Sequence, residues 1–379
     1  MIERPQIRWL EAGERRSAHW RSENGRPAPT RIAIADDSLS ADAAYRMISA
    51  GTALLWRGDF HNARQLLQAL ARRVDRKPRN AKPLPPSADS PAVAFLLQRQ
   101  AQARRARLLS MLLLPFDPGH RLPLRRAPDV HLACAEAYGL ADEPYVVSLR
   151  ELLGLIGAHE WRKTGVAVPA LAARVHPHYG VFAPVRGEYV DLVNTAPLPS
   201  SELAFDIGTG TGVLAAVLAR RGVARVVATD RDSRALACAG ENLARLGLEQ
   251  RVKLVQTDLF PEGRAPLIVC NPPWVPALPN SALELAVYDP ESRMLRGFLD
   301  GLAPHLAPGG EGWLVLSDIA EHFGLRTRAE LLGWIANARL TVLGRLDVRP
   351  QHPRVSDASD PLHATRRAEV TSLWRLSLR

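Results

Sequence analysis

From residue 203 onward, short apolar runs alternate with stretches in which apolar residues recur every three or four positions. This alternation predicts strands and helices in turn, as in a Rossmann-like, doubly wound α/β sheet. Five strands are expected at 203–207, 225–229, 252–257, 266–270 and 312–317, with helices at 213–221, 233–246 and 291–306. Two further strands, at 341–348 and 369–377, complete a predicted seven-stranded sheet, and the polar stretch 350–366 between them is expected to be a mobile loop.

The first 160 residues follow a different pattern. Residues 1–35 look weakly ordered, and a basic, proline-rich break occupies 76–91. The remaining apolar residues have helical spacing. Helices are expected from Ser40, from a cap at Asp59 to Val74, from Asp89 to about Leu114, and over 128–138 and 146–158. The sequence therefore predicts an all-α domain over 1–160 and an α/β domain over 161–379.

The positive charge is concentrated in the predicted helical domain. Residues 1–150 hold 24 Lys and Arg against 15 Asp and Glu, a balance of +9, whereas residues 151–379 hold 25 against 24. A basic face attracts phosphate backbones or acidic protein surfaces. An arginine-rich composition that merely decorates solvated helix faces explains the same count, so the charge leaves both interpretations open.

Composition favours an ordinary globular protein, with 46% hydrophobic and 23% charged residues. No apolar run approaches the roughly 20 residues of a membrane span, and the N-terminal residues lack the pattern of a signal peptide. The cysteines Cys134, Cys238 and Cys270 have no CxxC spacing. We therefore expect a reducing, cytoplasmic setting with no membrane partner and no structural zinc.

A glycine-rich segment, Phe-Asp-Ile-Gly-Thr-Gly-Thr-Gly at 205–212, follows the first strand of the predicted sheet. Because glycine has no Cβ, such a turn lets the backbone bend tightly and approach a ligand closely. The dehydrogenase fingerprint GxGxxG requires glycine where this chain has Val213, which argues against a nicotinamide cofactor without excluding it. The turn predicts a site for a nucleoside-bearing cofactor, formed by Gly208, Thr209, Gly210 and Gly212.

Acidic residues lie at three successive strands of the predicted sheet. Asp206 precedes the glycine turn, where the charged head of a cofactor would lie, and Asp230 is placed to accept both hydroxyls of a ribose. Asp258 can accept from an adenine amino group while Leu259 or Phe260 packs on the ring. Each acid alone could instead cap a helix or end a strand. Their common position at the carboxyl edge of the sheet favours the cofactor site.

The segment Asn271-Pro272-Pro273-Trp274 follows the fourth predicted strand. The side-chain oxygen of Asn271 and the carbonyl of Pro272 can accept both hydrogens of a planar NH2 group. This favours a tetrahedral nitrogen and frees its lone pair for attack on a methyl group, while the prolines stiffen the corner. Trp274 offers a face on which a base or an amide can stack. An ordinary turn is the alternative, but the pairing with the glycine turn indicates methyl transfer from S-adenosylmethionine to nitrogen.

The segment 176–189 lies upstream of the glycine turn and contains His176 and His178. Two histidines without a neighbouring cysteine or carboxylate cluster make a poor metal site, so we expect no metal. The segment is instead expected to be a loop and helix start that covers the cofactor pocket from the side.

Residues from about 176 to 379 resemble class I S-adenosylmethionine-dependent methyltransferases of the "small" group, which includes HemK-like glutamine N5-methyltransferases and ribosomal RNA guanine-N2 and adenine-N6 enzymes. The resemblance rests on 206–212, 258–260 and 271–274, and on 180–184, which resembles the segment that touches the methionine part of the cofactor. It implies cofactor contacts for Phe182, Pro184 and Asn271. The tetrapeptide of this group ends most often in Tyr or Phe, so Trp274 keeps the stacking role but changes the size of the pocket.

The leading hypothesis is an N-methyltransferase acting on an exocyclic base amine of RNA, with the basic helical domain docking the nucleic acid. The alternative is a glutamine N5-methyltransferase acting on a translation factor or ribosomal protein, which needs the same corner without phosphate contacts. A cofactor-binding protein that has lost catalysis is a third reading, against which the intact Asn271 and Asp230 argue. The motifs do not indicate an oligomeric state.

Overall fold

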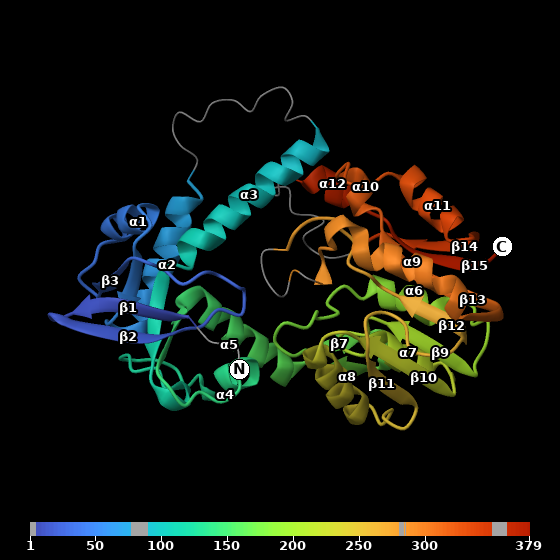
Figure 1. The fold of residues 1–379 in the computed structure, drawn as a ribbon, viewed down its shortest axis with the longest axis horizontal. Coiled ribbons are helices and arrows are strands. Elements are labelled where there is room, and N and C mark those ends of the chain that lie inside the picture. Colours follow the sequence, from blue (N-terminus) through green and yellow to red (C-terminus); the bar gives the residue numbers. More distant parts are fainter. Residues whose placement is uncertain (1–4, 77–89, 280–283, 285, 351–361) are drawn as a thin grey trace. The chain divides into compact units, whose positions relative to one another are not determined.

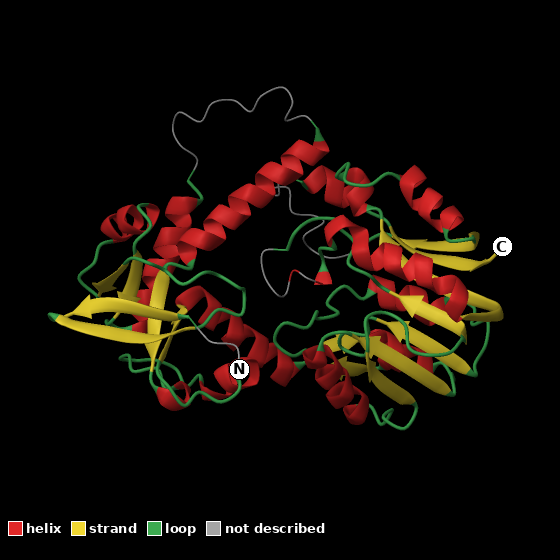
Figure 2. Cartoon of the chain, viewed as in Figure 1, coloured by secondary structure: helices red, strands yellow, loops and turns green. Residues whose placement is uncertain are grey.

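The computed structural model describes residues 5–76, 90–279, 284, 286–350 and 362–379. The chain divides into two compact units, one comprising Met1–Pro85 with Leu96–Glu160 and the other Pro86–Phe95 with Trp161–Arg379. Each unit is built on its own β-sheet (Figures 1 and 2).

The first unit contains a six-stranded sheet in the order β1-β2-β6-β5-β4-β3. The strands β3, β4 and β5 are parallel, while β6 runs antiparallel to β5 and β1 forms an antiparallel hairpin with β2. The strands are β1 (Gln6–Glu11), β2 (Glu14–Trp20), β3 (Ile32–Ala35), β4 (Ala53–Trp56), β5 (Leu112–Phe116) and β6 (Tyr145–Ser148). The helices are α1 (Ala41–Ser49), α2 (Phe60–Val74), α3 (Pro91–Leu109), α4 (His131–Tyr138) and α5 (Leu149–Thr164), of which α3 and α5 cross the boundary between the units.

The prediction of an all-α domain over 1–160 is wrong, because six strands lie within this range. The strands β4, β5 and β6 are runs of four or five residues in which every residue is buried. Periodicity cannot distinguish such short buried runs from helix segments. The expected helix ending near Leu114 ends at Leu109, and the one expected over 146–158 begins only at Leu149. The helix cap at Asp59 is confirmed, because its carboxylate accepts from the backbone N–H of His61.

The second unit contains a seven-stranded sheet in the order β11-β10-β9-β12-β13-β15-β14, which confirms the predicted doubly wound α/β fold. All neighbouring strands are parallel except β15, which is antiparallel to both β13 and β14. The strands are β9 (Leu203–Ile207), β10 (Arg225–Asp230), β11 (Val252–Gln256), β12 (Ala265–Cys270), β13 (Leu306–Ser317), β14 (Leu340–Val348) and β15 (Thr371–Leu378). A separate hairpin pairs β7 (Val166–Val168) with β8 (Ala173–Val175).

Helices cover both faces of this sheet (Figure 1). One core cluster joins the sheet to α6 (Glu188–Thr195), α7 (Val213–Arg220) and α8 (Ser233–Arg245). The other joins it to α9 (Arg293–His305) and α11 (Arg328–Asn337). The shorter helices α10 (Ile319–His322) and α12 (His363–Ala368) lie near the C-terminal strands. Because both faces are buried, the polar ends of the strands are left for binding and chemistry.

Two segments differ from the predicted boundaries. The helix expected to begin at Glu291 begins at Arg293, because Glu291 and Ser292 have left-handed backbone angles with φ of 58° and 55°. Asp289 lies before this turn, and its carboxylate accepts from the backbone N–H groups of Met294 and Leu295. The mobile loop expected over 350–366 lies mostly outside the described residues, and its described end enters α12.

Candidate active site

The glycine turn connects β9 to α7 through three left-handed residues. Gly208, Gly210 and Gly212 have φ of 73°, 56° and 80°. The backbone N–H of Thr209 donates to the carbonyl of Thr229 at 2.8 Å, which ties the turn to the neighbouring strand β10. A Cβ added at Gly208 would lie 2.4 Å from Cε of Met294, so an alanine there would require the Met294 side chain to shift.

Asp206 is fully buried beneath this turn, with 1% of its surface exposed. Its Oδ2 accepts from the hydroxyl of Thr209 at 2.6 Å and from the backbone N–H of Ala215 at 3.1 Å. Burial raises the pKa of Asp206 to about 6, and these two hydrogen bonds offset only part of that effect. The carboxyl group also lines the cavity, so a cation there would stabilise its charged form.

Asp230, at the end of β10, is oriented by two backbone groups. Its Oδ2 accepts from the N–H of Gly210 at 3.0 Å and its Oδ1 from the N–H of Asp232 at 3.0 Å. A carboxylate offers about four acceptor positions, so each oxygen retains one for a ligand hydroxyl. Asp232 itself caps α8 by accepting from the backbone N–H of Arg234.

Asp258 forms an ion pair with Arg293, in which Nη1 of the arginine lies 3.4 Å from Oδ1 of the carboxylate. Both side chains are about half exposed, at 52% and 55%. The expected acceptor for an adenine amino group is therefore already engaged by a cation. Leu259, the next residue, has φ of 75°, and its carbonyl accepts from the hydroxyl of Thr229 at 2.6 Å. Left-handed backbone at a non-glycine residue is strained and is found preferentially at functional sites.

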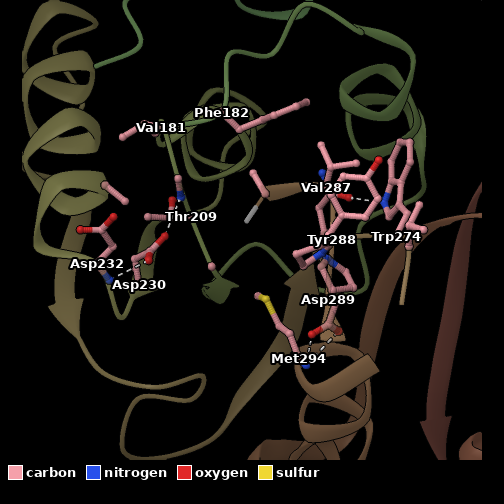
Figure 3. Close-up of a pocket in the computed structure, with 18 of the residues that line it drawn as sticks. Val181, Phe182, Thr209, Asp230, Asp232, Trp274, Val287, Tyr288, Asp289 and Met294 are labelled. Carbon is pink, nitrogen blue, oxygen red and sulfur yellow. Dashed lines mark hydrogen bonds between the residues drawn. The ribbon is translucent and has the colours of Figure 1, made fainter. Parts of the chain in front are cut away.

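A cavity of about 570 Å³ brings most of the predicted residues together. Figure 3 shows Asp230 and Asp232 on one side of it and Trp274 and Tyr288 on the other, with the thioether of Met294 between them. Among the predicted residues, Pro184 and Gly212 are not part of its lining. The lining includes the predicted Phe182, Asp206, Gly208, Thr209, Gly210, Asp230, Asp258, Leu259, Asn271, Pro272, Pro273 and Trp274.

The Asn271–Trp274 corner contains an internal hydrogen bond. The indole Nε1–H of Trp274 donates to Oδ1 of Asn271 at 2.9 Å. A carbonyl oxygen has two lone pairs, so Oδ1 of Asn271 can still accept one hydrogen bond from a substrate. The guanidinium carbon of Arg186 lies 5.1 Å from the centroid of the indole and covers one of its faces. The predicted stacking role of Trp274 is thereby restricted to the other face.

Several residues of the cavity wall carry no sequence motif. Phe95, from the first turns of α3, stacks on Phe323 with ring centroids 4.6 Å apart. Arg186 lies two residues after the segment 180–184, so its charge next to that motif could have indicated a place in the site. Glu369 precedes β15 as a single acid, and only the tertiary fold places it here. The additional lining residues that sequence analysis did not single out include Phe95, Arg186, Asp289, Met294, Phe323 and Glu369.

His176 and His178 have local protein partners in the structure. Nδ1 of His176 lies 2.7 Å from the carbonyl of Arg162, and Nε2 of His178 lies 3.0 Å from Oε2 of Glu241. Within the described ranges, no group of three His, Cys, Asp or Glu side chains has an arrangement that could hold a metal ion. Among the helices of the described residues, none is both long enough and apolar enough to cross a bilayer.

Residues 174–323 match the family model of the methyltransferase small domain. A release factor glutamine methyltransferase of Mycolicibacterium smegmatis is 34% identical over 205 residues, covering 52% of this chain and 68% of the relative. The chain belongs to the small-domain family of S-adenosylmethionine-dependent methyltransferases. The family indicated by the sequence motifs is thereby confirmed.

Two other relatives match shorter parts of this methyltransferase. A release factor glutamine methyltransferase of Cereibacter sphaeroides is 36% identical over 179 residues, which are 43% of this chain. The match spans 63% of that relative's own length. A ribosomal protein uL3 glutamine methyltransferase of Neisseria gonorrhoeae is 40% identical over 119 residues, covering 30% of this chain and 37% of the relative.

S-adenosylmethionine, the cofactor of this family, fits the residues of the cavity. The left-handed glycines Gly208 and Gly210 present bare backbone to the cavity. Asp230 retains acceptor positions suited to ribose hydroxyls, and Asp206 is a buried acid suited to an ammonium group. These residues lie in the same cavity as the Asn271–Trp274 corner, so cofactor and acceptor can meet in one place.

Proposed function

We propose that this methyltransferase transfers a methyl group from S-adenosylmethionine to the side-chain amide of a glutamine in a protein of the translation machinery. The observation that carries the proposal is the shared cavity, in which the Asn271–Trp274 corner lies with the glycine turn and Asp230. The names of the relatives from Cereibacter sphaeroides and Neisseria gonorrhoeae support a glutamine acceptor in a protein.

In this proposal the chain's own residues orient the acceptor nitrogen. Oδ1 of Asn271 and the carbonyl of Pro272 accept the two N–H groups of the substrate amide, which directs the nitrogen lone pair away from its conjugated plane. S-adenosylmethionine, when bound, supplies an electrophilic methyl group. The amide nitrogen forms a bond to the methyl carbon as the carbon–sulfur bond breaks and its electron pair stays on sulfur. The methylated nitrogen then loses one proton to water.

The charge of the N-terminal part does not decide between RNA and a protein acceptor. Among the described residues, several arginines of the first unit form ion pairs with acids of the same unit. Nη2 of Arg57 lies 2.7 Å from Glu11, Nε of Arg73 lies 2.7 Å from Asp42, and Nε of Arg105 lies 2.8 Å from Asp75. Asp59, whose side chain is fully buried, accepts from both Arg125 and Arg126. These acids are already counted in the balance of +9, which suits an acidic protein surface as well as a phosphate backbone. The protein acceptor is the better supported substrate because the names of the relatives indicate one.

The first unit has a role within this proposal. The residues that line the cavity belong to the second unit, including Phe95 at the start of α3. We assign the first unit to recognition of the acceptor protein.

The proposal is tested with labelled S-adenosylmethionine and extract from cells that lack this protein. Adding the wild-type chain should label protein, and digestion followed by mass spectrometry should find N5-methylglutamine. The N271A variant is the matched negative control. Label that is removed by ribonuclease, together with steep weakening of acceptor binding by added salt, would identify RNA as the substrate instead.

A further inference from the structure

Segments that are distant in the sequence meet beside the Asn271–Trp274 corner. Arg186 precedes α6, Ser317 ends β13 and Glu369 precedes β15. Arg186 and Glu369 line the same cavity as Asn271 and Trp274, so they form part of the active-site wall. The cofactor-binding and acceptor roles of the preceding paragraphs do not use either of these two charged residues.

Arg186 is held by two buried carboxylates. Its Nε donates to Glu188 at 2.7 Å and its Nη2 donates to Oε1 of Glu369 at 3.0 Å. Oε1 of Glu369 also accepts from the hydroxyl of Ser317 at 2.7 Å. The side chains of Glu188 and Glu369 are only 9% and 4% exposed, and charge-assisted hydrogen bonds are strong in such surroundings. Burial opposes the charge of the guanidinium, but the two carboxylates outweigh it and raise the pKa of Arg186.

The guanidinium of Arg186 in turn lies over the indole of Trp274, 5.1 Å from the ring centroid. Cation–π attraction operates at this distance, so the fixed arginine restricts rotation of the ring. The orientation of the ring sets the direction of its Nε1–H, which donates to Oδ1 of Asn271. An indole nitrogen can only donate a hydrogen bond. The contact therefore requires the oxygen of the Asn271 amide at this position and excludes its NH2 group.

We propose that Arg186 and Glu369 are positioning residues for methyl transfer, because they hold Trp274 in the orientation that fixes Oδ1 of Asn271. This inference rests on the proposed function. Without this restraint the Asn271 amide can rotate by half a turn and present its NH2 group to the substrate NH2, where two donors oppose each other. The arrangement therefore acts on the transfer step. Cofactor affinity depends on other residues, chiefly Asp230 and the glycine turn.

The test uses the full chain and the variants W274F, R186M, E369Q and R186M/E369Q. R186M leaves the buried carboxylates of both Glu188 and Glu369 without their cation, whereas R186M/E369Q leaves only that of Glu188, so comparing the two variants separates the effect of an unpaired charge from mispositioning. We expect kcat to fall about tenfold or more in each variant, with the dissociation constant of the cofactor within about threefold of wild type. R186M should lower kcat little further in a W274F background, because both substitutions remove the same restraint.

Arg345 provides a matched control. Its guanidinium lies 5.1 Å from the ring centroid of Trp374 and pairs with Asp347 at 2.8 Å, but none of these three residues lines the cavity. R345M should keep the kcat of wild type. Additive effects of R186M and W274F on kcat, or an unchanged kcat in R186M/E369Q, would overturn the proposal.

A crystal structure of R186M/E369Q gives a readout that needs no acceptor. We expect the distance between Nε1 of Trp274 and Oδ1 of Asn271 to exceed hydrogen-bonding range, whereas a retained contact near 2.9 Å overturns the positioning role. Failure of the wild type to methylate any glutamine would contradict the proposed function instead. The crystallographic result would still decide the role of Arg186 and Glu369.

Discussion

The backbone N–H of Gly210 donates to Oδ2 of Asp230 at 3.0 Å, so the glycine turn and the end of β10 hold each other in place. The N–H of Asp232 fixes the other oxygen of the same carboxylate. Asp230 is therefore oriented before any ligand arrives, and binding loses little side-chain entropy. This preorganisation explains how a half-buried strand end can bind a flexible nucleoside.

Replacing Asp230 by alanine should weaken cofactor binding before it affects anything else. The variant loses the acceptors for the ribose hydroxyls and also the two backbone hydrogen bonds that shape the turn. Hydrogen bonds to charged groups contribute roughly 1.5–3 kcal/mol, so we expect about a 100-fold rise in the dissociation constant of S-adenosylmethionine by calorimetry. The control D300A removes an exposed acid of α9 and should bind like wild type. Equal affinity of D230A and D300A would disprove the assignment of Asp230.

The buried Asp206 should make stability depend on pH in a defined window. Burial raises the pKa of its carboxyl group from 3.8 to about 6. Between these two values the folded state binds a proton that the unfolded state has lost, so stability falls as the pH rises through this window and is then constant. The expected loss is up to about 3 kcal/mol, at about 1.4 kcal/mol for each pH unit. Urea denaturation from pH 4 to pH 7 measures this loss as the difference between wild type and D206N in how the free energy of unfolding changes with pH.

The same group should couple the pH to cofactor binding. An ammonium group beside Asp206 favours the ionised carboxylate, so affinity for S-adenosylmethionine should increase as the pH rises through about 6. The D206N variant should bind more weakly at pH 7 and lose this dependence. A parallel pH dependence in both proteins would show that another group is responsible.

The sequence identified the second unit far better than the first, and the reason is physical. The strands β9, β10 and β11 are separated by the helices α7 and α8, and a glycine turn marks the end of β9, so local pattern and global fold agree. In the first unit, strands such as β4 and β5 are too short for their periodicity to be visible, and they gain their stability from pairing with strands distant in the chain. Local spacing contains no information about that pairing.

The candidate site was predicted where its residues lie within motifs and missed where distant segments approach. Asp206, Asp230 and Asn271 were assigned to one site, and they line one cavity. Phe95 and Glu369 are far apart in the sequence, and no local pattern relates them to the cavity. The donation from Trp274 to Asn271 was also missed, because a flat aromatic ring next to an NH2 site suggested stacking alone.

Substituting Gly208 by alanine should damage the cofactor turn in two ways. The residue has φ of 73°, which costs roughly 1–2 kcal/mol for a residue with a side chain, and the new Cβ would lie 2.4 Å from Cε of Met294. We expect loss of measurable cofactor binding and a lower melting temperature. Because Cε ends a flexible side chain that can move aside, the strained backbone is the lasting cost, and G208A/M294A should recover little of the stability.

Gly187 offers a matched control for that substitution. Its φ is −75°, and a Cβ built there meets nothing within 4 Å. G187A should therefore keep the melting temperature and the cofactor affinity of wild type. If G208A bound the cofactor as tightly as G187A does, the inference that the ligand approaches this turn closely would be wrong.

Replacing Asn271 by alanine should separate chemistry from binding. The variant loses the side-chain acceptor that orients the substrate nitrogen, and removal of a single preorganised group of this kind typically costs about 100- to 1000-fold in kcat. The glycine turn and Asp230 stay intact, so the cofactor dissociation constant should remain within about threefold of wild type. Single-turnover transfer of labelled methyl measures the first quantity and calorimetry the second, with the exposed N337A on α11 as control. A large loss of cofactor affinity in N271A would mean that Asn271 supports the cofactor pocket itself, because an acceptor-orienting amide affects the transfer step and leaves cofactor binding unchanged.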